Sequence, residues 1–185
     1  MKMDKLLFID TETGGIDPQK HSLLSIGYVL WDKRLIAPIK NEMLLKSENY
    51  VVTVTAQRLN HFDLQKHNDR AMEASEIISE FSTINDMYFA GKGIQLAGHN
   101  TQFDIQFIKK LYADNNRSYE KTFSHRIVDT YSILRFLQDA KKIEMETLSS
   151  AKAFSYFGIK VDGRHSALGD AEATMKLYEK LIEIV

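Results

Sequence analysis

Residues 6–15 read LLFIDTETGG and set the framework for the rest of the chain. The first four residues are apolar on both faces, as in the central strand of a sheet that is covered on both sides. Asp10 and Glu12 then continue one face of this strand, because alternate residues of a strand point the same way. The segment from residue 13 to residue 20 has the composition of a turn. The sequence therefore predicts a buried strand with two carboxylates at its C-terminal end.

The rest of the chain predicts a mixed sheet flanked by helices. Three more strands are expected in succession, as in an antiparallel meander, at residues 22–31, 35–39 and 43–46. Helical periodicity and short strands alternate after them, with helices at 71–89, 101–112, from 130, at 147–157 and at 168–184, and strands at 94–97 and 126–128. Strands first, then alternating strands and helices, predict an α/β fold.

Length and composition indicate one ordinary globular domain spanning residues 1–185. The chain has 185 residues, of which 44% are hydrophobic and 26% charged, enough to bury a single core. It has no cysteine, which excludes disulfides and thiolate metal sites and is compatible with a reducing compartment. Neither a signal peptide nor a membrane-spanning run is visible. We therefore expect a cytoplasmic protein without a membrane partner; the sequence does not indicate an oligomeric state.

The charge balance limits how the chain would handle nucleic acid. The formal net charge is -1, whereas proteins that bind duplex DNA by counterion release usually carry a clear basic excess. A nucleic-acid substrate would then be bound locally, at an end or as a short single strand. Bound divalent cations would supply part of the positive field.

Two more acids lie on faces that their helices should bury. Asp104 is in helical register with Ile108, and Asp170 is in register with Leu177. An acid in the first turn of a helix also has a simpler explanation, because it stabilises the helix dipole. However, no Lys or Arg occupies an inward position of the same three elements, and an unpaired buried carboxylate is costly. Divalent cations would solve this charge problem, and oxygen ligands without thiolates favour Mg²⁺ or Mn²⁺.

Four motifs, in this order, resemble those of the DEDDh (DnaQ-like) 3′–5′ exonucleases. This group includes the proofreading subunit of DNA polymerase III and ribonuclease T. The motifs span nearly the whole chain: LLFIDTETGGIDP (6–18), GHNTQFDIQFIKKLY (98–112), VDTYSILRF (128–136) and GRHSALGDAEATMKLYEKL (163–181). The resemblance implies an RNase H-like fold with a five-stranded mixed sheet.

The resemblance also implies the roles of the acids and of one histidine. Asp10, Glu12, Asp104 and Asp170 match the four acids that bind two divalent cations, Mg²⁺ or Mn²⁺. His165, five residues before Asp170, matches the histidine that activates water. A histidine in a loop is often only a surface residue. The five-residue spacing to Asp170 is the feature that favours a catalytic role for His165.

Other positions match the part of the family that holds the nucleotide. Thr13 and Gly14 match backbone positions at the 3′-terminal nucleotide, and Asn100 and Phe103 match the lining of its pocket. Asp129 matches an acid often found between the second and third motifs, and we expect it to be structural or a neighbour of the site.

The chain departs from the family pattern at two positions. Ser25 stands where many relatives have a glutamate, which leaves the matched metal ligands unchanged. Gly15 stands where relatives commonly have a larger side chain, so a side chain that wedges against the terminal base would be absent. These departures bear on substrate selectivity.

The leading interpretation is a metal-dependent 3′–5′ exonuclease that removes nucleoside 5′-monophosphates from the 3′ end of DNA, either in proofreading or as a stand-alone enzyme. Its partners would be single-stranded 3′ ends, with a DNA polymerase as a candidate protein partner. Two alternatives stay open. One is an RNA-directed 3′–5′ exoribonuclease of the same family, since the motifs do not reveal contacts to the 2′-hydroxyl. The other is a non-catalytic nucleic-acid-binding scaffold, against which the intact acids and histidine argue.

Overall fold

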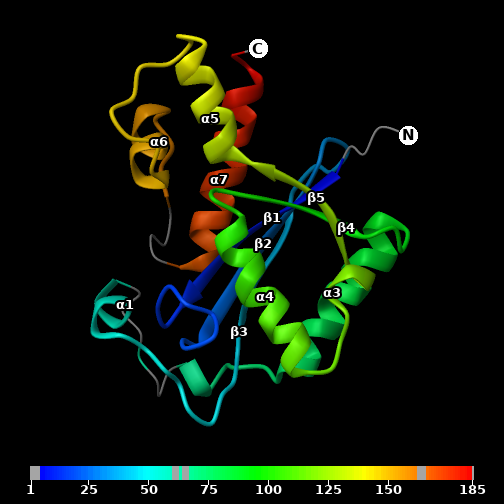
Figure 1. The fold of residues 1–185 in the computed structure, drawn as a ribbon. Coiled ribbons are helices and arrows are strands. Elements are labelled where there is room, and N and C mark those ends of the chain that lie inside the picture. The colour runs from blue at the N-terminus through cyan, green and yellow to red at the C-terminus, as the bar shows by residue number, and fades with distance from the viewer. Residues whose placement is uncertain (1–4, 60–62, 64–66, 162–165, 185) are drawn as a thin grey trace.

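A mixed five-stranded sheet forms the centre of the described protein (Figure 1). The structure is a computed structural model that describes residues 5–59, 63, 67–161 and 166–184. The strand order is β3-β2-β1-β4-β5, and the strands are β1 (Lys5–Thr13), β2 (Leu23–Asp32), β3 (Ile39–Leu44), β4 (Ile94–Gly98) and β5 (Phe123–Asp129). The first three strands form an antiparallel meander, and β4 and β5 run parallel to β1. The predicted α/β fold with a mixed sheet is confirmed.

Helices cover both faces of this sheet (Figure 1). They are α1 (Val54–Leu59), α3 (Ala74–Phe89), α4 (Gln102–Asp114), α5 (Thr130–Asp139), α6 (Ser150–Tyr156) and α7 (Ala167–Ile182), with a short 3₁₀ helix, η1 (Tyr119–Lys121). α3 and α4 share one hydrophobic core with the sheet, α7 covers the opposite face, and α5 and α6 pack against α7. No helix in the described parts of the chain has both the length and the apolar character needed to cross a membrane.

The apolar start of β1 is buried from both sides, which explains its continuous hydrophobic run. Leu7 and Ile9 belong to the core beneath α3 and α4. Leu6 and Phe8 face the other way and pack with Met175 of α7. Because the strand lies between two helical layers, its alternating side chains lead to opposite sides of the sheet.

The sequence-based strands at 35–39 and 43–46 are wrong in their boundaries. A single strand, β3, occupies residues 39–44, and the segment before it is an exposed loop. The prediction relied on apolar residues such as Leu35 and Ile36, but the Ile36 side chain is fully exposed. Pro38 cannot donate a ladder hydrogen bond. The helix expected at 147–157 begins later, at Ser150, and α1 was not predicted.

Candidate active site

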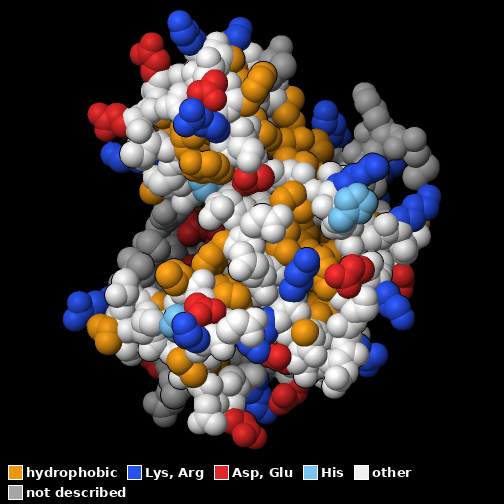
Figure 2. Space-filling model, viewed as in Figure 1, with side chains coloured by type: hydrophobic (Ala, Val, Ile, Leu, Met, Phe, Trp, Pro, Cys, Tyr) orange, Lys and Arg blue, Asp and Glu red, His pale blue; other side chains and the backbone are white. Residues whose placement is uncertain are grey.

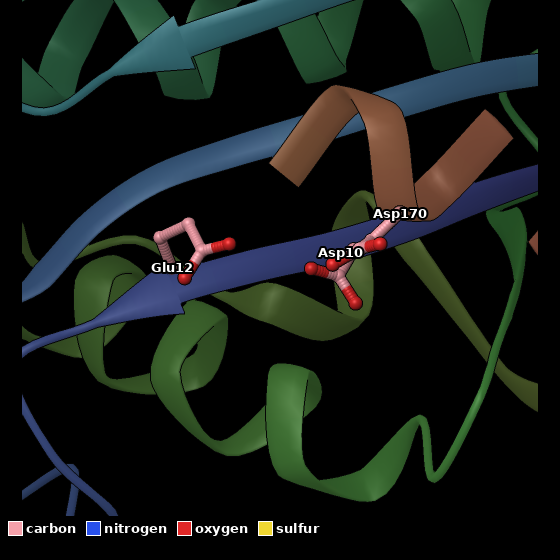
Figure 3. A group of neighbouring side chains, drawn as sticks. All are labelled: Asp10, Glu12 and Asp170. Atoms are coloured by element: carbon pink, nitrogen blue, oxygen red, sulfur yellow. The ribbon is translucent and has the colours of Figure 1, made fainter. Parts of the chain in front are cut away.

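Three carboxylates meet where the end of β1 faces the start of α7. Asp10 and Glu12 project from the same face of β1, and Asp170 lies in the first turn of α7 (Figure 3). One carboxylate oxygen from each residue can be chosen so that all three atoms lie within 4.8 Å of one another. All three residues are partly buried. The strand and the helix thus bring together acids that are about 160 residues apart in the sequence.

A glycine in β2 allows α7 to start at this place. Gly27 lies directly opposite Asp10 in the antiparallel pair, and the start of α7 rests on it. A Cβ atom at position 27 would lie only 2.1 Å from the carbonyl carbon of Ala167. The helix begins after Ser166, whose hydroxyl accepts a hydrogen bond of 3.1 Å from the Gly169 N–H. The absence of a side chain at Gly27 therefore places Asp170 next to Asp10.

The donor set of this cluster fits a divalent cation. Mg²⁺ and Mn²⁺ prefer carboxylate and water oxygens, and Mg²⁺ binds oxygen at roughly 2.0–2.1 Å. Oxygens within 4.8 Å of one another can lie around one ion with only small side-chain movements. Two of the three acids come from one strand, which holds them at a fixed separation.

Asp104 occupies a different position from the three clustered acids. It lies in the first turn of α4 and is only 4% exposed, and its Oδ1 accepts a hydrogen bond of 2.7 Å from the Thr11 hydroxyl. Thr11 lies between Asp10 and Glu12 on β1, so its side chain points to the opposite face. Burial raises the pKa of Asp104 to about 7, and the hydrogen bond from Thr11 opposes this rise. The structure thus ties the fourth acid to the strand that carries the first two.

The loop after β1 is held by hydrogen bonds within the loop and to the backbone of residues 22 and 53. The Thr13 hydroxyl donates to the Gly15 carbonyl at 2.7 Å. The Gly14 N–H donates to the Ser22 carbonyl, and the Gly14 carbonyl accepts from the Thr53 N–H, both at 2.7 Å. The polar groups of Gly14 are therefore engaged within the protein, and Gly14 serves the packing of this loop.

The turn between β4 and α4 carries the other two residues matched to a nucleotide pocket. Asn100 is exposed and has a left-handed backbone with φ 61°. Phe103 is half-buried, and its ring lies 5.3 Å from that of Phe107. An exposed polar residue next to a partly exposed ring can provide both a hydrogen-bonding group and a stacking surface.

The sequence missed two residues that build this site, and one predicted residue lies outside the described part of the chain. Gly27 interrupts an apolar strand, which is a known signal of close backbone approach. Thr11 showed no signal beyond its place between two acids. His165 falls outside the described residues, so the structure gives no position for it. Ser25 is buried directly opposite Glu12, next to the cluster.

Comparison with known proteins identifies the family. A family model described as "Exonuclease" (RNase_T) matches residues 7–178. The chain belongs to this exonuclease family. Its relatives and structural neighbours are DnaQ-like 3′–5′ exonucleases, so the resemblance seen in the motifs is confirmed.

The curated relatives of this exonuclease chain include a subunit of DNA polymerase III and PolC-type DNA polymerases III. The chain is 26% identical to DNA polymerase III subunit epsilon of Treponema pallidum over 175 residues, covering 94% of this chain and 74% of the relative. It is 27% identical to the PolC-type DNA polymerase III of Caldanaerobacter subterraneus, covering 97% of this chain but only 12% of that protein.

Solved structures share the fold. An exonuclease I structure has a TM-score of 0.80 and 18% identity, covering 97% of this chain and 41% of its own. The complex of E. coli exonuclease I with a dT13 oligonucleotide has a TM-score of 0.77 and 16% identity, covering 97% and 40%. The exonuclease chain described here thus spans about two fifths of these neighbours.

Proposed function

We propose that this protein is a metal-dependent 3′–5′ exonuclease that releases nucleoside 5′-monophosphates from the 3′ end of single-stranded DNA. The observation that carries the proposal is the convergence of Asp10, Glu12 and Asp170 in a chain of an exonuclease family. We propose these three acids as direct ligands of divalent cations. Asp104 is proposed as the fourth acid of the set, oriented by its hydrogen bond with Thr11.

The chemistry needs a polarised phosphate and an activated water. Two bound Mg²⁺ or Mn²⁺ ions would stabilise charge on the scissile phosphate and lower the pKa of the attacking water. His165 is proposed as the base that accepts the proton of this water, because an imidazole with an ordinary pKa near 6.5 can do so at neutral pH. His165 lies in the segment directly before the start of α7.

The substrate is proposed to enter at its free 3′ end. Asn100 and Phe103 lie at the N-terminal end of α4, where the ring of Phe103 can stack on a base. Thr13 and the packed Gly14 loop lie at the end of β1, directly after Glu12. A pocket that closes over the terminal nucleotide between these elements would select an end over an internal bond.

Charge distribution favours a single strand over a duplex. The net charge is -1, and on the face shown in Figure 2 the Lys and Arg side chains are dispersed among acidic ones. This arrangement offers no broad basic surface to a duplex on the described part of that face. DNA is favoured over RNA because the relatives include a DNA polymerase III subunit and a neighbour was solved with a dT13 oligonucleotide. For the same reason, a DNA polymerase is the protein partner that we propose to test.

The test is a 3′-end degradation assay on matched single-stranded DNA, duplex DNA and RNA, with Mg²⁺, Mn²⁺ or EDTA. We expect degradation of single-stranded DNA from its 3′ end with either metal and none in EDTA. Preferential degradation of RNA would replace the DNA proposal with an exoribonuclease. Binding of the strands by the wild-type protein without any cleavage would instead identify a scaffold.

A further inference from the structure

The turn between β4 and α4 contains an unusual backbone conformation. Asn100 has φ 61°, a left-handed region that few residues other than glycine adopt, and asparagine is among those that tolerate it best. The other described non-glycine residues with positive φ are Ala90, Asn116 and Lys141, and each follows the end of a helix, where this conformation is common. Asn100 instead precedes a helix. A left-handed residue in such a place points to a constraint imposed by the surroundings.

Asp129 supplies that constraint. Its Oδ1 accepts a hydrogen bond of 2.7 Å from the Asn100 N–H, and its Oδ2 accepts one of 2.7 Å from the Ser132 hydroxyl. Asp129 ends β5, directly precedes α5 and lies opposite Gly98 in the parallel pairing. Hydrogen bonds to a carboxylate are roughly twice as strong as those between neutral groups. One side chain thus joins the turn before α4 to the first turn of α5.

Neighbouring contacts fasten the same turn. The buried Thr130 hydroxyl donates to the Gly98 carbonyl at 3.0 Å and lies 3.0 Å from Nδ1 of His99. The residues that follow Asn100 start α4, since its carbonyl accepts from the Phe103 N–H at 3.0 Å.

We propose that Asp129 is a positioning residue for the nucleic-acid substrate. By holding Asn100 in the left-handed conformation, it sets the exposed Asn100 side chain and the Phe103 ring at the entrance of α4. This inference rests on the proposed function, because it assumes that a nucleotide binds there. Asp129 is absent from the metal-ligand group found among the described residues. Its loss should therefore weaken substrate binding much more than the affinity for a metal ion held by Asp10, Glu12 and Asp170.

Two substitutions of Asp129 distinguish the loss of its hydrogen bonds from the loss of its negative charge. Asp129→Asn keeps an oxygen that can accept from the Asn100 N–H and places an amide where it can donate to Ser132. Asp129→Ala removes both bonds. We expect Asp129→Ala to raise KM for a single-stranded oligonucleotide about tenfold or more, and Asp129→Asn to stay within about threefold of wild type. The Mn²⁺ affinity, measured by calorimetry, should change much less than KM in both variants. Asp139→Ala is the control, because it removes an acid at the C-terminal end of α5 and does not contact the turn between β4 and α4.

Amide hydrogen exchange over residues 98–105 gives a measurement that does not depend on activity. We expect faster exchange in this segment for Asp129→Ala and near-wild-type exchange for Asp129→Asn and Asp139→Ala. Equal KM increases in the Asn and Ala variants would show that the charge matters and would overturn the positioning role. Unchanged KM and exchange in Asp129→Ala would also overturn it. If the wild-type protein degrades no substrate, the proposed function fails, while the exchange data still decide whether Asp129 holds the turn.

Discussion

The contact between Gly27 and the start of α7 offers a direct test of how the acidic cluster is assembled. In the variant Gly27→Ala, the added Cβ would lie 2.1 Å from the carbonyl carbon and 2.3 Å from the carbonyl oxygen of Ala167. Both neighbours are backbone atoms, so no side chain can rotate away. Either the strand or the helix has to move.

The size of this movement follows from the structure. Ordinary contacts of a Cβ begin near 3.4 Å, so β2 and the start of α7 would have to separate by about 1.3 Å. Asp170 lies three residues after Ala167 on α7, so this separation would also move Asp170 away from Asp10 on the sheet. A displacement of about 1 Å in an active site can lower the rate about 100-fold, and overpacking of this kind typically costs about 1–3 kcal/mol of stability. We therefore expect a loss of roughly 100-fold in kcat and a weaker Mn²⁺ affinity.

The assay combines kcat on a single-stranded oligonucleotide, Mn²⁺ binding by calorimetry and thermal unfolding. Gly158→Ala is the matched control. A Cβ there meets no atom within 4 Å, but its φ of 65° strains an alanine. The control should lose stability without losing kcat. If Gly27→Ala kept kcat and Mn²⁺ affinity within about threefold of wild type, the structural reasoning about α7 would be wrong.

Three further predictions concern stability, two of them near the site and one at the opposite end of β1 and β2. Burial raises the pKa of Asp104 to about 7, so the metal-free native state retains a proton that the unfolded state releases near pH 4. The metal-free protein should therefore lose stability as pH rises from about 4 to 7, and saturating Mg²⁺ should suppress this loss. A melting temperature that stays constant over that pH range would contradict the prediction. The Arg34 side chain lowers the pKa of Asp32 to about 2. Arg34→Gln should therefore cost about 1 kcal/mol of unfolding free energy in urea at pH 7, and this cost should shrink as pH falls from about 4 through 2. An equal cost at pH 7 and pH 2 would refute a stabilising ion pair. In Gly14→Ala the Cβ would lie 2.0 Å from the Val51 carbonyl oxygen. We expect about 1–3 kcal/mol of destabilisation and a higher KM with unchanged Mn²⁺ affinity. An unchanged unfolding free energy would show that the loop moves aside without cost.

The sequence alone was sufficient to predict the central strand and the direction in which its two acids point. A period of two placed Asp10 and Glu12 on one face, and the structure has them there. Helical periodicity also marked Asp104 as inward, and it is 4% exposed. Periodicity states only that a side chain points inward. It does not state which side of the sheet a helix covers, so it could not separate Asp104, on the α4 side, from Asp170, on the α7 side.

The remaining features depend on pairings between distant segments. The register that sets Gly27 opposite Asp10 comes from the whole meander, and the close approach of α7 to Gly27 comes from packing across the sheet. The apolar pair Leu35 and Ile36 predicted a strand because local hydrophobicity carries no information about whether a partner strand is available. Residues of the β1–β2 loop were matched to nucleotide binding, but only the structure shows that the backbone of Gly14 is already hydrogen-bonded.

Asp10 and its neighbouring acids are proposed to hold the divalent ions that make cleavage at the 3′ end possible. The most direct measurement is the time course of a 5′-labelled single-stranded DNA oligonucleotide with Mg²⁺, comparing wild type with Asp10→Asn in parallel. We predict a ladder of products shortened one nucleotide at a time by the wild-type protein, and a rate at least about 1,000-fold lower for the folded variant. Products of equal yield from Asp10→Asn, or cleavage by the wild type that persists in EDTA, would contradict the claim.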